Sequence, residues 1–304
     1  MTSPSNDPFG LVGTRLDGKY DVESVVAEGG FGVVYRATHR TLGTPVAVKV
    51  LKVPAELEGG ARKAFLERFQ LEAKVIARLD HPAIVRVTDF GAGPMPVGEA
   101  APWMVLEWLT GTTFDADLEA RRGRGGRAPA ECLALLRPAF DALAYAHDEG
   151  IAHRDIKPEN LFLAESRRGE RTTRVLDFGI AKAMGDEEGQ SSGQTATRTQ
   201  QRAFTLYYAA PEQLSGTRTG PWTDVYALAL VLTELLTDWP PYDGEDVQDV
   251  YAEVLSPRRP TPAKRGFDVG SWEPVIARAV ASKPADRYPN ARAFLAALEA
   301  SVPA

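Results

Sequence analysis

The chain has 304 residues, of which 44% are hydrophobic, so it can bury a large core as one big domain or as two lobes. Its formal net charge of −6 argues against a general nucleic-acid-binding protein, which would carry a strongly basic face. The single cysteine, Cys132, has no second cysteine for a disulfide or a thiolate metal site. We therefore expect Cys132 to pack in the interior of a protein that works in a reducing, cytoplasmic environment.

Residues 1–14 lack the basic and apolar regions of a signal peptide, and we predict a disordered lead-in over this range. The longest apolar run, "VYALALVLTELLT" at 225–237, contains Glu234 and is well short of the roughly 20 residues that span a bilayer. We predict no membrane-spanning segment, and we keep open that the chain is the front part of a longer protein.

Residues 15–53 alternate between apolar and polar side chains and are broken by Gly-rich turns, which predicts three antiparallel strands. In "AEGGFGVV" at 27–34, Gly29 and Gly32 lie in a turn where backbone N–H groups can approach a phosphate. In "VAVK", the alternation places Ala47 and Lys49 on one face of the third strand. This face offers a small surface for a flat base beside a cation for phosphates.

A helix is predicted over "ARKAFLERFQLEAKVIARLD", because apolar residues recur there at helical spacing. Glu72 lies in the middle of the apolar stripe. A buried carboxylate without a partner costs about 3–5 kcal/mol, so Glu72 requires a cation, and Lys49 is the candidate. Two further strands, "AIVRVTDF" and "PWMVLEWL", are expected to complete the first lobe near residue 109.

The rest of the chain is predicted to be mainly helical, after a basic, Gly-rich loop at 121–129 that we interpret as a solvated connector. The predicted helices are "AECLALLRPAFDALAYAHDEG", "DVYALALVLTELLT", "EDVQDVYAEVL", "WEPVIARAVA" and "NARAFLAALEA". Between Met184 and Phe204 the sequence has almost nothing able to hold it in a core. We expect that segment to be mobile unless something orders it.

Chemistry-bearing residues cluster in "AHRDIKPEN" at 152–160, where Asp155, Lys157 and Asn160 supply a proton acceptor, a phosphate-binding cation and a metal-binding amide. Asp177, in "LDFGIA", follows across a short polar hairpin and can return beside this loop to bind a divalent metal. The same Asp-Phe-Gly triplet begins at Asp89, which we interpret as a turn at the end of a strand.

The order of these motifs resembles the signature set of the protein kinase family, and in particular the bacterial eukaryotic-like serine/threonine kinases. The resemblance covers about residues 15–300 and includes the Gly-rich turn, VAVK, the helix Glu, HRDxKPxN, DFG and APE. It implies an α+β bilobal fold, with a small, mainly β N-lobe that has one regulatory helix at 15–109. A larger, mainly α-helical C-lobe would span 110–304, with an activation segment at 177–212.

For the nucleotide, the resemblance implies that Gly29 and Gly32 cover the phosphates of ATP and that Lys49, paired with Glu72, binds the α- and β-phosphates. The adenine would be bound by Val34 and Ala47 above the ring, by Phe162 below it, and by backbone groups around Glu107 to Leu109, after a gatekeeper at Leu106. Ala27 stands where the family has its first glycine. This departure predicts a somewhat weaker affinity for ATP.

For catalysis, the resemblance implies that Asp155 orients the substrate hydroxyl and accepts its proton, and that Lys157 stabilises the transferring γ-phosphate. Asn160 and Asp177 would bind Mg²⁺, with Mn²⁺ as an alternative. Thr205 would contact the catalytic loop and, with Lys157, favours the serine/threonine branch over the tyrosine branch.

Three further residues match structural positions of the family. The resemblance implies that Arg287 pairs with Glu212 and that Asp224 holds the catalytic loop, which is the motif at 152–160. We expect His153 to be a packed part of the loop and no general base.

Regulation is implied by Arg154, because an Arg beside the catalytic Asp is typical of kinases whose activation segment is ordered by phosphorylation. We hypothesise autophosphorylation at Thr197 or Thr199. The weaker candidates are Ser191, Ser192 and Thr195. The expected partners are protein substrates with Ser or Thr and a second copy of the chain acting in trans, with no nucleic acid.

Two alternatives remain open. A pseudokinase scaffold would bind nucleotide without transfer, and the presence of Lys49, Asp155, Asn160 and Asp177 argues against it. A small-molecule phosphotransferase of related fold is disfavoured by "APEQ", Asp224 and Arg287. The location is expected to be cytoplasmic, either as a free protein or as the cytosolic kinase domain of a longer, membrane-anchored one.

Overall fold

The computed structural model describes residues 7–30, 32–54, 57–166, 168–178, 206–244 and 246–301. The chain divides into two compact units. The described part of the first unit comprises residues 7–80 and 85–109, and that of the second comprises residues 81–84, 110–178 and 206–301.

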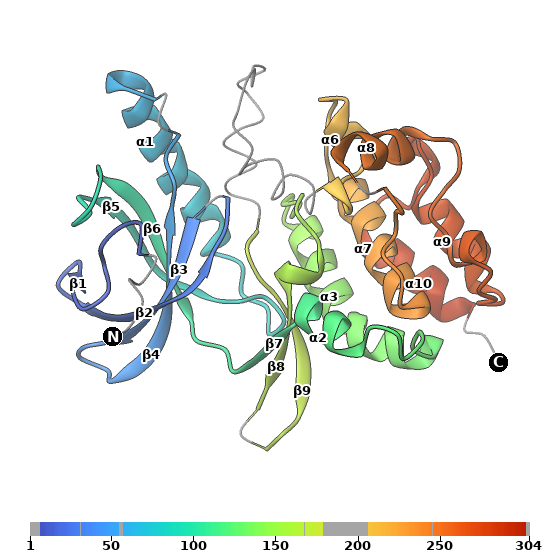
Figure 1. Ribbon diagram of the computed structural model, residues 1–304, viewed down its shortest axis with the longest axis horizontal. Helices are drawn as coiled ribbons and strands as arrows, with labels where there is room; N and C mark the ends of the chain where they lie inside the picture. Colours follow the sequence, from blue (N-terminus) through green and yellow to red (C-terminus); the bar gives the residue numbers. More distant parts are fainter. Residues whose placement is uncertain are drawn as a thin grey trace. The chain divides into compact units, whose positions relative to one another are not determined.

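The first unit is built on a six-stranded antiparallel sheet in the order β1-β2-β3-β4-β6-β5 (Figure 1). Its strands are β1 (Arg15–Leu16), β2 (Tyr20–Glu28), β3 (Gly32–His39), β4 (Thr44–Leu51), β5 (Val87–Gly93) and β6 (Ala101–Glu107). The three strands expected between residues 15 and 53 are β2 to β4. One face of the sheet covers a buried apolar cluster that includes Val33, Tyr35, Val48 and Val105.

Residues 7–14 belong to this core, so the prediction of disorder is wrong for this part of the lead-in. Leu11 is 2% exposed and lies in the buried cluster of the sheet. The hydroxyl of the buried Tyr35 donates a hydrogen bond of 2.7 Å to Asp7 Oδ1. The short apolar stretch "FGLV" supplies enough buried surface to order the chain here. The polar residues on either side of this stretch are the reason that the sequence predicted disorder.

Helix α1 (Gly59–Ile76) contacts β5 and β6 of the same unit (Figure 1). Phe69 and Ala73 are buried, while Glu72 is half-buried on this helix. Arg62 donates to the carbonyl of Ala100 at 2.7 Å, which ties the start of the helix to the segment before β6. The amphipathic helix expected from the sequence is therefore present and packs on the sheet.

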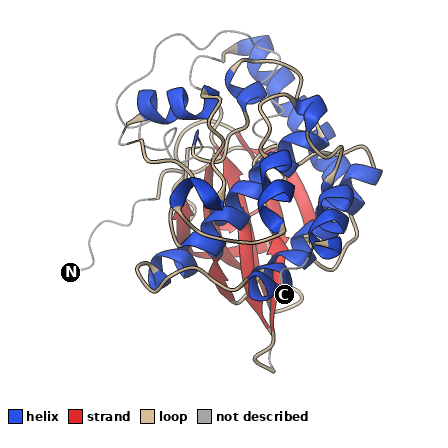
Figure 2. Ribbon diagram, turned by 90° about the vertical axis from the view of Figure 1, so that its right-hand side faces the viewer, coloured by secondary structure: helices blue, strands red, loops and turns tan. Residues whose placement is uncertain are grey.

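The second unit is largely helical (Figure 2) and contains a small antiparallel sheet in the order β7-β8-β9. The strands are β7 (Gly111–Thr113), β8 (Leu161–Glu165) and β9 (Arg171–Val175). Its α-helices are α2 (Phe114–Arg121), α3 (Pro129–Asp148), α6 (Pro211–Leu214), α7 (Pro221–Thr237), α8 (Val247–Leu255), α9 (Trp272–Ala279) and α10 (Ala291–Ala300). The described residues of this unit also form the 3₁₀ turns η1 (Pro158–Asn160), η2 (Pro262–Arg265) and η3 (Pro284–Asp286).

Helix α7 is the core element of the second unit. It is buried continuously from Thr223 to Thr237 and contacts α3, α9 and α10. A helix that is apolar on all sides must be covered on all sides, which explains the long apolar run in the sequence. Among the described residues, no helix has the length and apolar character that crossing a membrane requires.

Residues 122–126 of the basic loop at 121–129 are exposed, as expected for a solvated connector, but two of its arginines also form ion pairs that were not predicted. Arg127 is 7% exposed, forms an ion pair with Asp117, and lies 3.1 Å from Glu131. Arg122 is 3.3 Å from Glu234 of α7. Charge runs look solvated in a sequence because their partners, here on α2, α3 and α7, are brought to them only by the fold.

Candidate active site

Asp155, Lys157 and Asn160 come together in the loop that precedes β8. The side-chain amide of Asn160 donates to the Asp155 carbonyl at 2.7 Å and to Asp155 Oδ2 at 3.0 Å. Lys157 Nζ lies 3.6 Å from the same Oδ2, and the Asp155 side chain is 13% exposed. The loop thus fixes a carboxylate that is still accessible, with a cation and an amide directly beside it.

His153, which is fully buried, holds the backbone of this loop. Its Nε2 lies 2.7 Å from the Leu176 carbonyl, and its Nδ1 accepts the backbone N–H of Asp155 at 3.2 Å. A carbonyl can only accept and an N–H can only donate, so the ring must be the neutral Nε2–H tautomer. Burial lowers the pKa of His153, which agrees with a neutral ring and with the expected structural role.

Asp224 of α7 binds the same loop through its backbone. Its Oδ1 accepts the N–H of Arg154 at 2.7 Å, and its Oδ2 accepts the N–H of His153 at 2.7 Å. Oδ2 also lies 2.9 Å from Nε2 of His147, and the Asp224 side chain is fully buried. These bonds give Asp224 the loop-holding role that the resemblance implied.

Asp177 lies two residues after the end of β9, in the same unit as the loop that carries Asp155. The preceding residue, Leu176, donates its N–H to the Asn160 carbonyl at 2.9 Å. Phe178 is 5% exposed, and its ring centroid is 4.7 Å from that of His153. Asp177 itself has a φ of 49°, a left-handed conformation that non-glycine residues rarely adopt and that clusters at functional sites.

The donor set of this site suits a metal that arrives with a nucleotide. Mg²⁺ prefers oxygen ligands and usually keeps waters and substrate phosphates around one or two protein donors. Asp177 and Asn160 supply a carboxylate and an amide on segments joined by the Leu176 bond. Within the described ranges, no group of three or more His, Cys, Asp and Glu side chains is arranged to bind a metal by itself.

In the first unit, strand register gathers the predicted nucleotide-binding side chains on one face of the sheet. Ala27 pairs with Val34, Val34 pairs with Lys49, and Ala47 pairs with Leu106. Directly paired residues and residues two apart in a strand point to the same side. Met104 pairs with Lys49 and shares this face, but it was not among the residues predicted from the sequence. Its place two residues before Leu106 on the same strand is the signal that could have indicated it.

The Gly-rich turn joins β2 to β3. The N–H of Gly29 donates to the Gly32 carbonyl at 2.8 Å and closes the turn. A Cβ on Gly32 would lie 2.4 Å from the Val50 carbonyl oxygen, so only glycine fits there. Gly29 has open space around it, which is what a turn that covers phosphates requires.

The remaining nucleotide-binding predictions lie at the ends of strands. Glu107 ends β6, donates its N–H to the Arg86 carbonyl at 3.1 Å, and accepts the Arg86 N–H at 2.8 Å through Oε1. Leu109 is half-buried in the following segment, and Phe162 is half-buried in β8 of the second unit. Among the described residues no ion pair joins Lys49 to Glu72, so that pairing stays a prediction.

Asp89 lies inside β5, so its interpretation as a turn is wrong. Its Oδ2 accepts the Tyr20 hydroxyl at 2.8 Å and the Lys19 ammonium at 3.1 Å. Burial opposes ionisation, but these two bonds outweigh it and lower the pKa of Asp89. Gly91 pairs with Trp103 of β6 and lets the strand continue past the indole ring. A Cβ at position 91 would lie 2.5 Å from a carbon of that ring.

The buried pair expected from the family is present. Arg287 Nη1 and Nη2 each lie 2.8 Å from a different oxygen of Glu212. Thr223 donates to the same carboxylate at 2.8 Å. Thr205 and the phosphorylation candidates Thr197, Thr199, Ser191, Ser192 and Thr195 lie outside the described residues, as does most of the segment 177–212.

Comparison with known proteins agrees with this geometry. The sequence model of the family described as "Protein kinase domain" matches residues 20–286. The chain belongs to the protein kinase family. This kinase domain is 32% identical over 307 residues to the serine/threonine-protein kinase pkn3 of Myxococcus xanthus, covering 99% of the chain and 52% of that protein.

The domain is also similar to another bacterial serine/threonine kinase and to a solved bacterial kinase domain. It is 32% identical over 292 residues to PknB of Mycobacterium tuberculosis, covering 96% of the chain and 42% of that protein. The crystal structure of the Mycobacterium tuberculosis PknI kinase domain matches with a TM-score of 0.70 at 28% identity, covering 95% of this chain and 98% of that one. The predicted kinase fold is thus confirmed, and the chain spans about half the length of the first two curated relatives.

Proposed function

We propose that this chain is the catalytic domain of a serine/threonine protein kinase that transfers the γ-phosphate of ATP to Ser and Thr hydroxyls of proteins. The observation that carries the proposal is the loop constellation, in which Asp155 is bound by Asn160 and neighbours Lys157. A scaffold without catalysis has no need of this arrangement.

The roles follow from what each group can do. Asp155 is accessible and held rigidly, so it orients the substrate hydroxyl and accepts its proton. Lys157 stabilises negative charge on the transferring phosphoryl group. Phosphoryl transfer has a loose transition state, so positioning and charge neutralisation supply most of the catalysis.

The nucleotide is assigned to the face of the first unit that carries Val34, Ala47 and Lys49. The turn with Gly29 and Gly32 covers the phosphates, and Lys49 binds the α- and β-phosphates with support from Glu72. Asn160 and Asp177 would hold Mg²⁺, or alternatively Mn²⁺, which neutralises phosphate charge when bound.

A transfer assay tests the proposal. Purified protein is incubated with radiolabelled ATP, Mg²⁺ and a generic protein substrate, next to Asp155→Asn and Asp177→Asn. Both variants are expected to lose at least about 100-fold in rate. Asp89→Asn, the same substitution in the other Asp-Phe-Gly triplet, is the matched control and should retain transfer.

Other results would contradict the proposal. Nucleotide binding without transfer by the wild type would favour a pseudokinase. Transfer to small alcohols but not to proteins would favour a small-molecule phosphotransferase.

We also propose that the kinase phosphorylates its own activation segment in trans, at Thr197 or Thr199, and that Thr205 contacts the catalytic loop. Arg154 beside Asp155 supports this, because a phosphate group binds well to arginine. Mixing active wild type with inactive Asp155→Asn, followed by phosphopeptide mapping, tests it. An unmodified segment on the inactive copy would argue against modification in trans.

The single buried Cys132 supports a reducing location. We place the domain in the cytoplasm, either alone or as the cytosolic part of a longer, membrane-anchored protein. Fractionation of cells that express the full-length gene product, followed by detection of this domain, separates these two cases.

A further inference from the structure

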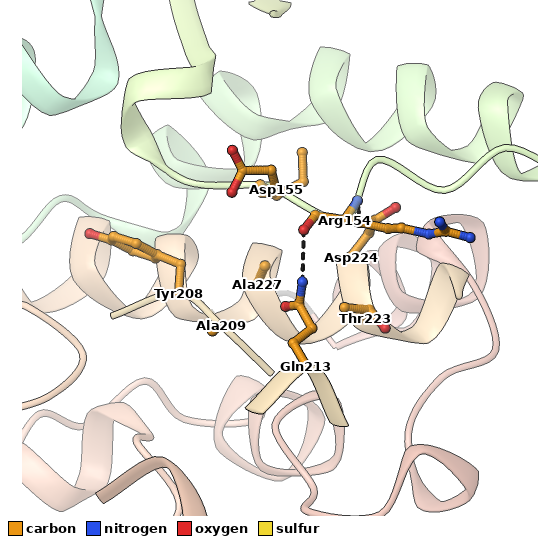
Figure 3. Close-up of a pocket in the computed structure, with 9 residues that line it drawn as sticks. Arg154, Asp155, Tyr208, Ala209, Gln213, Thr223, Asp224 and Ala227 are labelled. Carbon is orange, nitrogen blue, oxygen red and sulfur yellow. Dashed lines mark hydrogen bonds between the residues drawn. The ribbon is translucent and has the colours of Figure 1, made fainter. Parts of the chain in front are cut away.

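Gln213, the residue after the Ala-Pro-Glu motif, connects two segments that are distant in sequence. From α6, its Nε2 donates to the Arg154 carbonyl at 2.8 Å, across 59 residues of chain (Figure 3). Its Oε1 accepts the N–H of Ala210 at 3.0 Å. One side-chain amide therefore joins the catalytic loop to the stretch that leads into α6.

The bond matters because of the backbone that it holds. Arg154 has a φ of 62°, in the left-handed region, where a non-glycine residue costs about 1–3 kcal/mol unless its surroundings fix it. Its N–H is bound by Asp224 at 2.7 Å, and its carbonyl is bound by Gln213. The strained residue is thus held on both sides.

The peptide group between Arg154 and Asp155 is held at both ends. Its oxygen accepts from Gln213, and its N–H donates to Nδ1 of His153 at 3.2 Å. This group is the last one before the Cα of Asp155, so its orientation contributes, together with the Asn160 bond to Oδ2, to the direction in which the Asp155 carboxylate points.

Gln213 lines a cavity of about 10 Å³ together with Arg154, Asp155, Tyr208 and Asp224 (Figure 3). That volume holds about one water molecule. If the amide were removed, a mobile water would be left to bind the Arg154 carbonyl.

We propose that Gln213 is a positioning residue for Asp155 and couples the catalytic loop to the segment Tyr208–Ala210. The proposal rests on the proposed kinase function, since it concerns the base of that reaction. Gln213 bonds to the backbone of Arg154 and Ala210, so we assign its effect on Asp155 to the Arg154 carbonyl.

Two substitutions test the proposal. Gln213→Met keeps the length of the side chain and removes both hydrogen bonds. Gln213→Glu, when ionised, keeps the acceptor for Ala210 and loses the donor to Arg154. At pH 8 both variants should lose about five- to twentyfold in kcat, the range expected for a neutral hydrogen bond that steers a reacting group. The KM for ATP should stay within about twofold.

The pH dependence separates positioning from packing. The charged and titratable residues that line this cavity with residue 213 are Arg154, Asp155, Tyr208 and Asp224. Burial and the two carboxylates should raise the pKa of a carboxyl placed at residue 213, while the charge of Arg154 opposes them. Once protonated, Gln213→Glu can donate to Arg154 again. Its kcat relative to wild type should therefore rise as the pH falls from 8 to 6, while the ratio for Gln213→Met stays constant.

Ser215→Ala is the matched control, because Ser215 directly follows α6, is exposed, and donates its hydroxyl to the Pro211 carbonyl of that helix. It should keep wild-type kcat. A kcat within twofold of wild type in Gln213→Met would overturn the proposal, as would equal pH dependence of the two variants. Loss of folding in both would assign Gln213 to stability and would overturn it too.

Hydrogen exchange gives a readout that does not need catalysis. The Asp155 amide should exchange at least about fivefold faster in Gln213→Met than in wild type, because the carbonyl of the same peptide group then loses its bond from Gln213. An unchanged rate would contradict the inference, even if the wild type proved to transfer no phosphate. Failure of the proposed function and failure of this inference are therefore distinguishable.

Discussion

Arg287 and Glu212 form a two-point ion pair in which both hydrogen bonds are 2.8 Å and neither side chain is more than 2% exposed. The planar guanidinium matches the carboxylate in a way that a lysine ammonium cannot. Because Glu212 belongs to α6 and Arg287 follows η3, the pair joins two parts of the second unit that are 75 residues apart.

The first prediction concerns removal of one partner. Arg287→Ala should lower the free energy of unfolding by about 3–5 kcal/mol, because it leaves the Glu212 carboxylate buried without a cation. Arg287→Lys should lose less, since the charge is kept and only the second bond is lost. Urea unfolding followed by circular dichroism measures both, and equal stability of Arg287→Ala and wild type would contradict the structural role.

The second prediction concerns the N-terminal residues. Leu11→Ala should cost about 2–4 kcal/mol, as expected for a large-to-small change in a packed core. Leu42→Ala is the matched control, because Leu42 is 69% exposed and should change stability by less than about 0.5 kcal/mol. Thermal unfolding of both variants decides whether the lead-in belongs to the fold.

The third prediction is a pH dependence at Asp89, whose folded pKa is lowered by bonds from Tyr20 and Lys19 that outweigh burial. A carboxyl with a lowered folded pKa stabilises the protein fully above its unfolded pKa of about 3.9, and the contribution is lost as the pH falls through the folded value. Asp89→Asn should therefore be about 1 kcal/mol less stable than wild type at pH 7. The difference should shrink below about pH 4, and a difference that grew on acidification would argue against these bonds.

The fourth prediction compares two glycines of one turn. Gly32→Ala should destabilise the first unit by about 1–3 kcal/mol and weaken ATP binding, because the new Cβ would lie 2.4 Å from the Val50 carbonyl oxygen. Gly29→Ala should leave the melting temperature nearly unchanged, since the nearest contact of its Cβ is 3.9 Å. Calorimetry with and without MgATP separates the effect on folding from the effect on the nucleotide.

Much of the catalytic loop could be predicted because its parts lie close in sequence. Asp155, Lys157 and Asn160 fall within one turn-rich stretch, so local geometry alone brings them together. The placement of Ala47 and Lys49 on one face followed from the two-residue period of strands, whereas Val34 was assigned to this face by the family resemblance and joins it through its pairing with Lys49. Both kinds of inference depend on short-range rules that hold before tertiary packing is known.

Other features depend on partners that no local pattern reveals. The loop of Arg127 was interpreted as solvated because the partners of this arginine lie on other elements. Asp89 was interpreted as part of a turn because the Trp103 ring, which leaves no space for a Cβ at position 91, lies on the neighbouring strand. The role of Gln213 was invisible for the same reason, since its acceptor is 59 residues away. Tertiary contacts override the local preference in each case.

The shared face of β2, β3, β4 and β6 also limits how this chain can change in length. One residue inserted within β4 between Val46 and Lys49 would turn the lysine to the opposite side of the sheet, into the apolar cluster. An insertion in the connection between β3 and β4, at residues 40–43, leaves the pairing intact. Insertions and deletions compatible with nucleotide binding are thus confined to the turns, and each strand has a fixed count of residues.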